Sequence, residues 1–84
     1  MKDKTANQIV LPIPNNRYIS IVQNAKGYDY KGMGMRYGDY GKRVEIAILD
    51  SNFDIINDAF VYGVKGFLST EQLAKEIINL VIGD

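Results

Sequence analysis

The chain contains neither cysteine nor histidine. Without cysteine it has no disulfide framework, no thiolate zinc site and no thiol nucleophile. Without histidine it lacks the commonest general base, the usual metal ligand and every Ser–His catalytic pair. A pair of carboxylates is the remaining route to hydrolysis, and no two Asp or Glu residues stand out from the others. We therefore expect a protein without enzymatic activity, bound metal or cofactor.

Long hydrophobic runs are also missing. The longest purely apolar runs, such as 9–11 and 80–82, are far shorter than the roughly 20 residues that span a bilayer. Residues 1–8 are polar and lack the apolar core of a signal peptide. We expect a cytosolic protein without membrane contact, in the host cytosol if a phage encodes it, with residues 1–8 as a disordered tail.

The 84 residues suit a single domain, 1–84, which is too small for two separate cores. A chain of this size buries only about 60% of the surface that its unfolded form exposes. Because its own core is small, a protein partner or a second copy in a homodimer would add stability.

The charges are unevenly distributed, although the net charge is zero. Residues 1–43 carry eight basic and three acidic side chains, a net charge of +5, and residues 44–84 carry two basic and seven acidic ones, a net charge of −5. If the fold keeps the two halves apart, the molecule has a positive and a negative side. If strands from the halves interleave, the charges mix. The sequence leaves both arrangements open.

Alternating apolar residues predict strands. Residues 9–14 contain two prolines, which suits an edge strand or an extended lead-in. Residues 17–23 and 43–49 alternate clearly and predict two further strands. After a turn at 50–52, residues 53–56 favour a hairpin partner of the preceding strand, with extended chain over 60–67. Residues 54–61 also fit one face of a short helix.

The C-terminal segment carries the clearest helix signal. Ser69 and Gln72 form a capping box, and Leu68 and Leu73 are spaced for a hydrophobic staple around it. Apolar residues at helical spacing then predict a helix over 70–82. A helix of this length is marginal alone, so it needs to lie against a sheet. The expected fold class is α+β: an antiparallel sheet of three to five strands with this helix packed across one face.

Residues 24–43 have an unusual composition, with five of the eight glycines, four of the six tyrosines and five basic side chains. Tyrosine offers a large contact area with few rotatable bonds, and Arg or Lys adds charge-assisted hydrogen bonds. The alternative is a glycine-rich hairpin whose tyrosines cover a small core. On the first interpretation the partner-binding residues are Lys26, Tyr28, Tyr30, Lys31, Met33, Met35, Arg36, Tyr37, Tyr40, Lys42 and Arg43.

Two short motifs begin to match known sites and then fail. Residues 32–38 space their glycines as GxGxxxG but lack the βαβ unit of a dinucleotide site. Residues 50–54 match the first ligands of a calcium loop, but Ile55 stands where that loop needs glycine and Val61 where it needs glutamate. Neither motif predicts a ligand.

The order of the predicted elements resembles that of many small proteins of phages and plasmids. The resemblance rests on the strand at 18–23, the aromatic linker, the strand at 44–48 and the Gly-Phe-Leu-Ser-Thr-Glu-Gln-Leu run of 66–73 that opens the helix. It covers residues 18–82 and carries over no functional residue. It implies a mobile-element setting, in which small proteins without enzymatic activity block host defences by occupying a surface, as anti-CRISPR proteins do.

Two functions follow from these observations. The first is stoichiometric binding and inhibition of a host protein complex, such as a nucleoprotein defence complex, through residues 26–43. The second is a small module for single-stranded nucleic acid, in which the same tyrosines stack on bases and the basic residues contact phosphates. The neutral net charge favours the first function, because nucleic-acid-binding domains are usually basic.

A salt titration separates these two functions. At about 150 mM salt we expect no binding tighter than about 10 µM to random single-stranded DNA or RNA, because the acidic half repels phosphate. If five phosphates were contacted, a plot of log affinity against log salt would have a slope of about −3.5. A gel-shift titration that finds a sub-micromolar complex with such a slope would make nucleic-acid binding the leading function.

Overall fold

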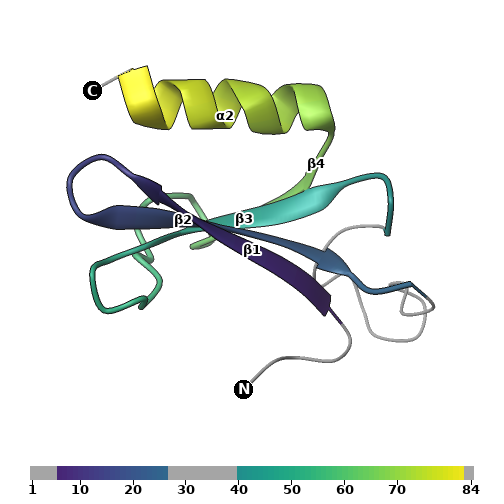
Figure 1. Ribbon diagram of the computed structural model, residues 1–84, viewed down its shortest axis with the longest axis horizontal. Coiled ribbons are helices and arrows are strands. Elements are labelled where there is room, and N and C mark those ends of the chain that lie inside the picture. Colours follow the sequence, from purple (N-terminus) through teal and green to yellow (C-terminus); the bar gives the residue numbers. More distant parts are fainter. Residues whose placement is uncertain (1–5, 27–39, 83–84) are drawn as a thin grey trace.

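The computed structural model describes residues 6–26 and 40–82, which form a four-stranded sheet and one helix (Figure 1). The strands are antiparallel and lie in the order of the sequence, and the helix lies over one face. This arrangement confirms the α+β fold expected from the sequence. The elements are β1 (Ala6–Ile13), β2 (Arg17–Asn24), β3 (Val44–Leu49), β4 (Lys65–Leu68) and α2 (Thr70–Ile82).

The hydrophobic core lies between the sheet and α2. Ile19 of β2 pairs with Ile48 of β3, and both are about 1% exposed, while the neighbouring Ile46 is fully buried. The apolar stripe of α2 packs against this layer through Leu73, Ile77 and Leu80. Burying an aliphatic side chain contributes about 1.5–3 kcal/mol. This layer is therefore the main source of the stability of the fold.

The other face of the sheet is buried at its centre as well. Ser20 and Ala47 lie opposite each other there, and Leu49 follows on the same face of β3. The ring of Phe53 packs on that of Tyr18, with the ring centroids 4.5 Å apart. Because β3 buries both its faces, it belongs at the centre of the sheet.

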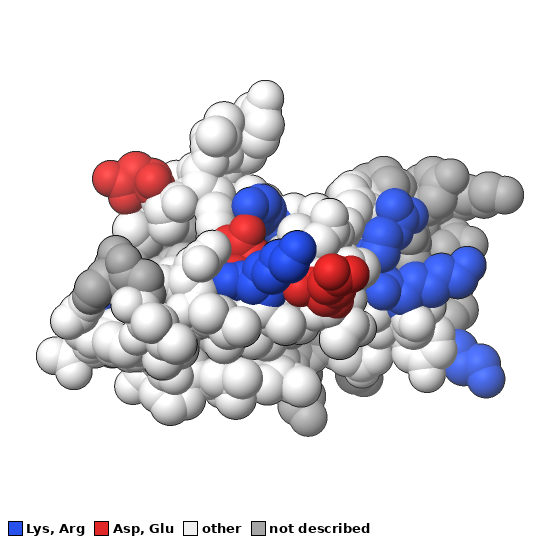
Figure 2. Space-filling model, turned by 90° about the horizontal axis from the view of Figure 1, so that it is seen from above, with Lys and Arg blue, Asp and Glu red and all other residues white. Residues whose placement is uncertain are grey.

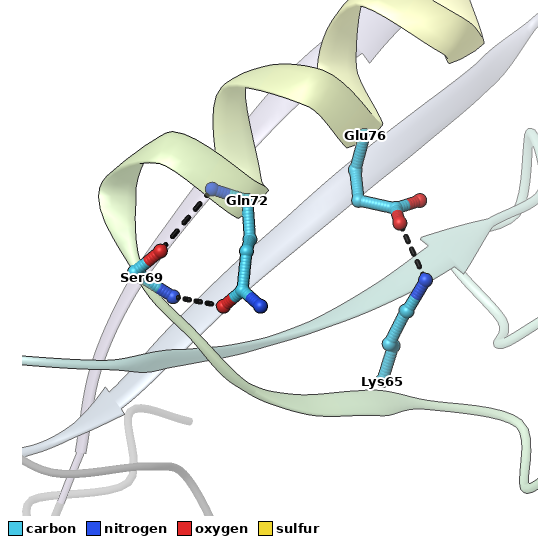
Figure 3. A network of polar contacts seen from close by, with 4 residues as sticks. All are labelled: Lys65, Ser69, Gln72 and Glu76. Atoms are coloured by element: carbon cyan, nitrogen blue, oxygen red, sulfur yellow. Dashed lines mark hydrogen bonds and ion pairs between the residues drawn. The ribbon is translucent and has the colours of Figure 1, made fainter.

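The start of α2 has the predicted capping box (Figure 3). The backbone N–H of Gln72 donates to Ser69 Oγ at 3.2 Å, and the N–H of Ser69 donates to Gln72 Oε1 at 2.9 Å. A cap of this kind contributes about 1 kcal/mol, because it satisfies backbone donors that have no partner within the helix. Glu71 and Lys75 form an i,i+4 ion pair on the exposed side of the helix, with 3.8 Å between Oε2 and Nζ.

The sheet begins earlier than the sequence indicated. Residues 6–8, which we expected in a disordered tail, are the first three residues of β1, and residues 1–5 lie outside the described part. These three residues pair with the end of β2, and Gln8 Nε2 donates to Ser20 Oγ at 2.9 Å. Polar residues form a strand here because a neighbouring strand supplies their backbone partners.

The prediction for the β3–β4 connection was wrong over 53–56, which form no strand apart from one isolated bridge between Ile55 and Leu49. The Asp50 carboxylate accepts hydrogen bonds from the N–H groups of Asn52 and Asp54, which closes a local turn. Phe53 within that turn has a φ of 65°, which a strand does not allow. Of the extended chain expected at 60–67, residues 60–64 form turns and bends, and the strand begins at Lys65.

A charge placed in the core should unfold the domain. Ile77→Asp should lower the free energy of unfolding by at least about 3 kcal/mol, because it buries an unpaired carboxylate against the sheet. The matched control Asn79→Asp, on the exposed side of the same helix, should cost less than about 1 kcal/mol. Urea unfolding followed by circular dichroism measures both. Equal stability of the two variants would show that α2 does not pack as described.

Candidate functional site

Residues 57–64, which we call the 57–64 loop, interrupt the pairing along the outer edge of β3. The edge is first paired at Ile56, whose N–H donates to the carbonyl of Ile48 at 2.8 Å. It is paired again by β4, opposite Val44 and Ile46. The 57–64 loop leaves the sheet between these two contacts. Its ends are thus fixed to the same strand.

Two successive turns order the loop. The N–H of Ala59 donates to the carbonyl of Ile56 at 3.1 Å, and the N–H of Gly63 donates to that of Phe60 at 3.0 Å. Gly63 is buried and has a φ of 79°, which glycine adopts without steric cost. Phe60 is half-buried and packs against the core. The loop therefore has its own hydrogen bonds and an aromatic anchor.

The tip of the loop carries Val61 and Tyr62, which are 91% and 89% exposed. These are the two highest exposures among the large hydrophobic residues of the described part of the chain. Single exposed apolar residues are common on protein surfaces, but two adjacent ones on an ordered loop form a convex apolar tip. Such a tip fits a concave apolar site on another molecule.

An open hollow of about 770 Å³ lies beside the tip. Residues 57–62 of the loop line it, together with Val64, Lys65 and Gly66 at the start of β4. The Lys65 ammonium at its rim forms an ion pair with Glu76 of α2, as Figure 3 shows. The ion pair neutralises the charge of this lysine. The site therefore has an apolar tip and a mainly apolar hollow on a single stretch of chain, without an unpaired ammonium at Lys65.

Most of the predicted contact segment lies outside the described residues. This applies to Tyr28, Tyr30, Lys31, Met33, Met35, Arg36 and Tyr37. The four other residues predicted to bind a partner are exposed at the two ends of the segment: Lys26, Tyr40, Lys42 and Arg43. The prediction that residues 26–43 bind a partner therefore stays a prediction.

Gln23 of β2 holds the second end of that segment. Its side-chain Oε1 accepts from the N–H of Gly41 at 2.9 Å, and its Nε2 donates to the carbonyl of Arg43 at 3.2 Å. The Arg43 guanidinium lies over the ring of Phe67, 4.9 Å from its centroid. Phe67 has a φ of 58° beside the irregular pairing of β3 and β4. The cation–π contact stabilises an aromatic residue in a backbone conformation that aromatic residues rarely adopt.

Within residues 6–26 and 40–82, the strands of the two halves of the sequence do not interleave, and charged side chains gather at opposite ends of the sheet. Lys26 follows β2, and Lys42 and Arg43 precede β3, so these three define the basic end; Figure 2 shows basic side chains gathered at the right-hand end of the molecule. Asp50 and Asp54 follow β3 and define the acidic end, where Arg17 also lies. Over α2, basic and acidic side chains alternate (Figure 2).

Sequence reasoning missed the 57–64 loop because it treated residues 60–67 as extended chain. The available signal was the turn-forming composition of Asn57, Asp58 and Gly63 on either side of an apolar stretch. The described residues contain no cluster of three or more acidic residues placed to hold a metal ion. Within 6–26 and 40–82, no helix is both long and apolar enough to cross a membrane.

Glycine substitutions test the conformation of the loop. Gly63→Ala should lower the free energy of unfolding by about 1–2 kcal/mol, because alanine is strained at positive φ. Gly66→Ala is the matched control, since its backbone is not in the left-handed region and the nearest atom to an added Cβ is 3.9 Å away. It should change stability by less than about 1 kcal/mol. Thermal unfolding measures both, and equal stabilities would contradict the turn at Gly63.

Comparison of the chain with protein-family models, curated proteins and solved structures found no match.

Proposed function

We propose that this chain is a non-enzymatic binding domain that docks on a protein partner through Val61 and Tyr62. The observation that carries this proposal is the near-complete exposure of two adjacent large apolar side chains on a loop with its own turns. The lack of histidine and cysteine supports a binding function over catalysis. The mode of action is stoichiometric occupation of a partner's surface.

The loop is suited to binding because little order remains to be imposed on it. Both turns and the Phe60 anchor are present in the unbound chain, so association does not have to fix the backbone. Tyrosine has few rotatable bonds and carries a hydroxyl that can hydrogen-bond at the rim of an apolar pocket. Residues of this kind are enriched among those that dominate the binding energy of protein interfaces.

The charges around the loop favour a protein over a nucleic acid. Asp54 and Asp58 lie on either side of the start of the loop, and Lys65 at its end is paired with Glu76. Phosphates would be repelled by the two carboxylates and would have to compete with Glu76 for the ammonium. An apolar pocket with a neutral or basic rim is the complementary surface.

A host defence complex is the class of partner that the resemblance to small phage and plasmid proteins implies. Such a setting agrees with a binding domain that acts by occupancy. Of the basic residues of 26–43, the described ones, Lys26, Lys42 and Arg43, lie at the other end of β3 from the start of the 57–64 loop. They are the second surface to test in the same experiment.

Truncation of the tip should separate binding from folding. Val61→Ala and Tyr62→Ala should each change the free energy of unfolding by less than about 0.5 kcal/mol, because both side chains are exposed. In combination they should weaken the complex at least about tenfold, as expected for the central residues of an interface. The double variant therefore remains folded, and it can be used as a folded competitor with weakened binding in the crosslinking experiment below.

A photo-crosslinking amino acid at Tyr62, in lysate of the host cell, identifies the partner. The expected result is one discrete adduct, which excess wild-type chain suppresses by competition. The Val61→Ala, Tyr62→Ala chain should compete about tenfold less effectively than the wild-type chain. The matched control places the crosslinker at Tyr40, which is 49% exposed at the basic end. An adduct from Tyr40 alone would move the interface to the 26–43 segment. If neither position gives an adduct, that result would contradict protein binding.

A further inference from the structure

A second apolar surface lies along β1, at the opposite edge of the sheet from the 57–64 loop. Ile9, Val10 and Leu11 of this strand are 58%, 38% and 42% exposed. Ile9 and Leu11 pair with Ile21 and Ile19, which places them on the face that α2 covers. The helix therefore leaves the apolar residues of β1 on this face of the sheet partly exposed to water.

The adjacent flank of α2 is apolar too. Glu76 marks the flank toward β4, because it forms an ion pair with Lys65 of that strand. Ile78 and Val81 lie on the opposite flank by helical geometry, toward β1, and are 53% and 51% exposed. The apolar surface thus continues from β1 onto the helix.

No charged residue occurs in β1. In Figure 1, β1 crosses in front of the other strands, so its side of the molecule is the lower side of Figure 2. There, to the left of the basic end, the described surface is mostly white. Exposed edge strands are usually protected by charges, prolines, bulges or shortness. β1 has eight residues in unbroken register with β2, and Pro12 is the one residue in it that cannot donate a hydrogen bond.

We propose that the chain forms a symmetric dimer in which β1 pairs antiparallel with β1 of a second copy. The two sheets then join into one sheet of eight strands, with both helices on the same face. The Ile78 and Val81 flanks of the two helices face each other across the twofold axis, above Ile9 and Leu11. Pairing uses the free backbone groups before Pro12.

The charge distribution is what identifies the occupant as a second copy in this orientation. β1 begins beside Asn24, at the basic end, and ends beside Arg17, at the acidic end. Antiparallel pairing therefore sets the basic end of one copy beside the acidic end of the other, whereas parallel pairing sets like ends together. Exposed charges are partly screened at physiological salt, so this pairing bears on the orientation more than on the affinity.

The available area agrees with a dimer. The five exposed aliphatic side chains, at roughly half exposure each, offer about 250 Å² of apolar surface per copy. A standard interface buries about 800 Å² per partner, of which somewhat more than half is apolar. These side chains supply about half of that apolar share, and the backbone and polar residues of β1 add to the rest. The dimer leaves both 57–64 loops exposed at its outer edges, so it does not depend on the proposed function.

Sedimentation velocity tests the proposal. At about 100 µM chain we expect a species of about 19 kDa, twice the chain's 9.4 kDa. Ile9→Lys and Ile78→Lys should each give a folded monomer by circular dichroism, because both replaced side chains are more than half exposed. The matched control Val61→Lys should remain a dimer even though it disables the proposed partner site. A wild-type monomer, or a dimer that withstands both β1-side substitutions, would overturn the proposal.

Single cysteines test the pairing itself, since the chain has none of its own. Cysteine placed in turn at Gln8, Ile9, Val10 and Leu11 should form an intermolecular disulfide fastest at the position on the twofold axis, and more slowly on either side. Val61→Cys should crosslink at least about tenfold more slowly than the fastest strand position. Equal rates at all five positions would show random collision and would rule out antiparallel β1 pairing.

Discussion

The fold depends on one layer of isoleucines between the sheet and α2. Ile19, Ile46 and Ile48 lose almost all contact with water, and Leu73, Ile77 and Leu80 close the layer from the helix side. A helix of 13 residues is marginal alone, and a sheet whose apolar face is open to water lacks the burial that would stabilise it. The sheet and the helix therefore stabilise each other. The 57–64 loop and the apolar side of β1 both lie beyond the area in which the two elements are in contact.

The two edges of the sheet end differently. At the β4 edge, the chain pairs with β3, leaves it for the 57–64 loop, and returns to it. Such interruption shortens the exposed edge and gives a loop whose ends are fixed. At the β1 edge, a long uncharged strand has no such interruption. The first edge provides the proposed contact with a different protein, and the second provides the proposed contact with a copy of the same chain.

The parts of the fold that follow local rules could be predicted from the sequence. Alternation in β2 and β3, and the capping box at Ser69 and Gln72, are local patterns that the structure retains. Residues 53–55 alternate as a strand would, but the Asp50 carboxylate accepts from two backbone donors and bends the chain. The exposure of Val61 and Tyr62 depends on both loop ends being held on β3. Contacts between residues distant in the sequence hold those ends, and the hydrophobicity of Val61 and Tyr62 alone would predict that both side chains are buried.

Whether the tip of the 57–64 loop is ordered before it meets a partner decides the account. Nuclear magnetic relaxation of backbone amides measures this directly, since order parameters are about 0.85 in rigid backbone and below about 0.6 in flexible segments. The turns at Ala59 and Gly63 predict values near 0.8 for Val61 and Tyr62, close to those of Ile46 and Ile48 in β3. Values below about 0.6 at the tip, with β3 rigid, would show that the loop is not preorganised and would contradict the proposed binding site.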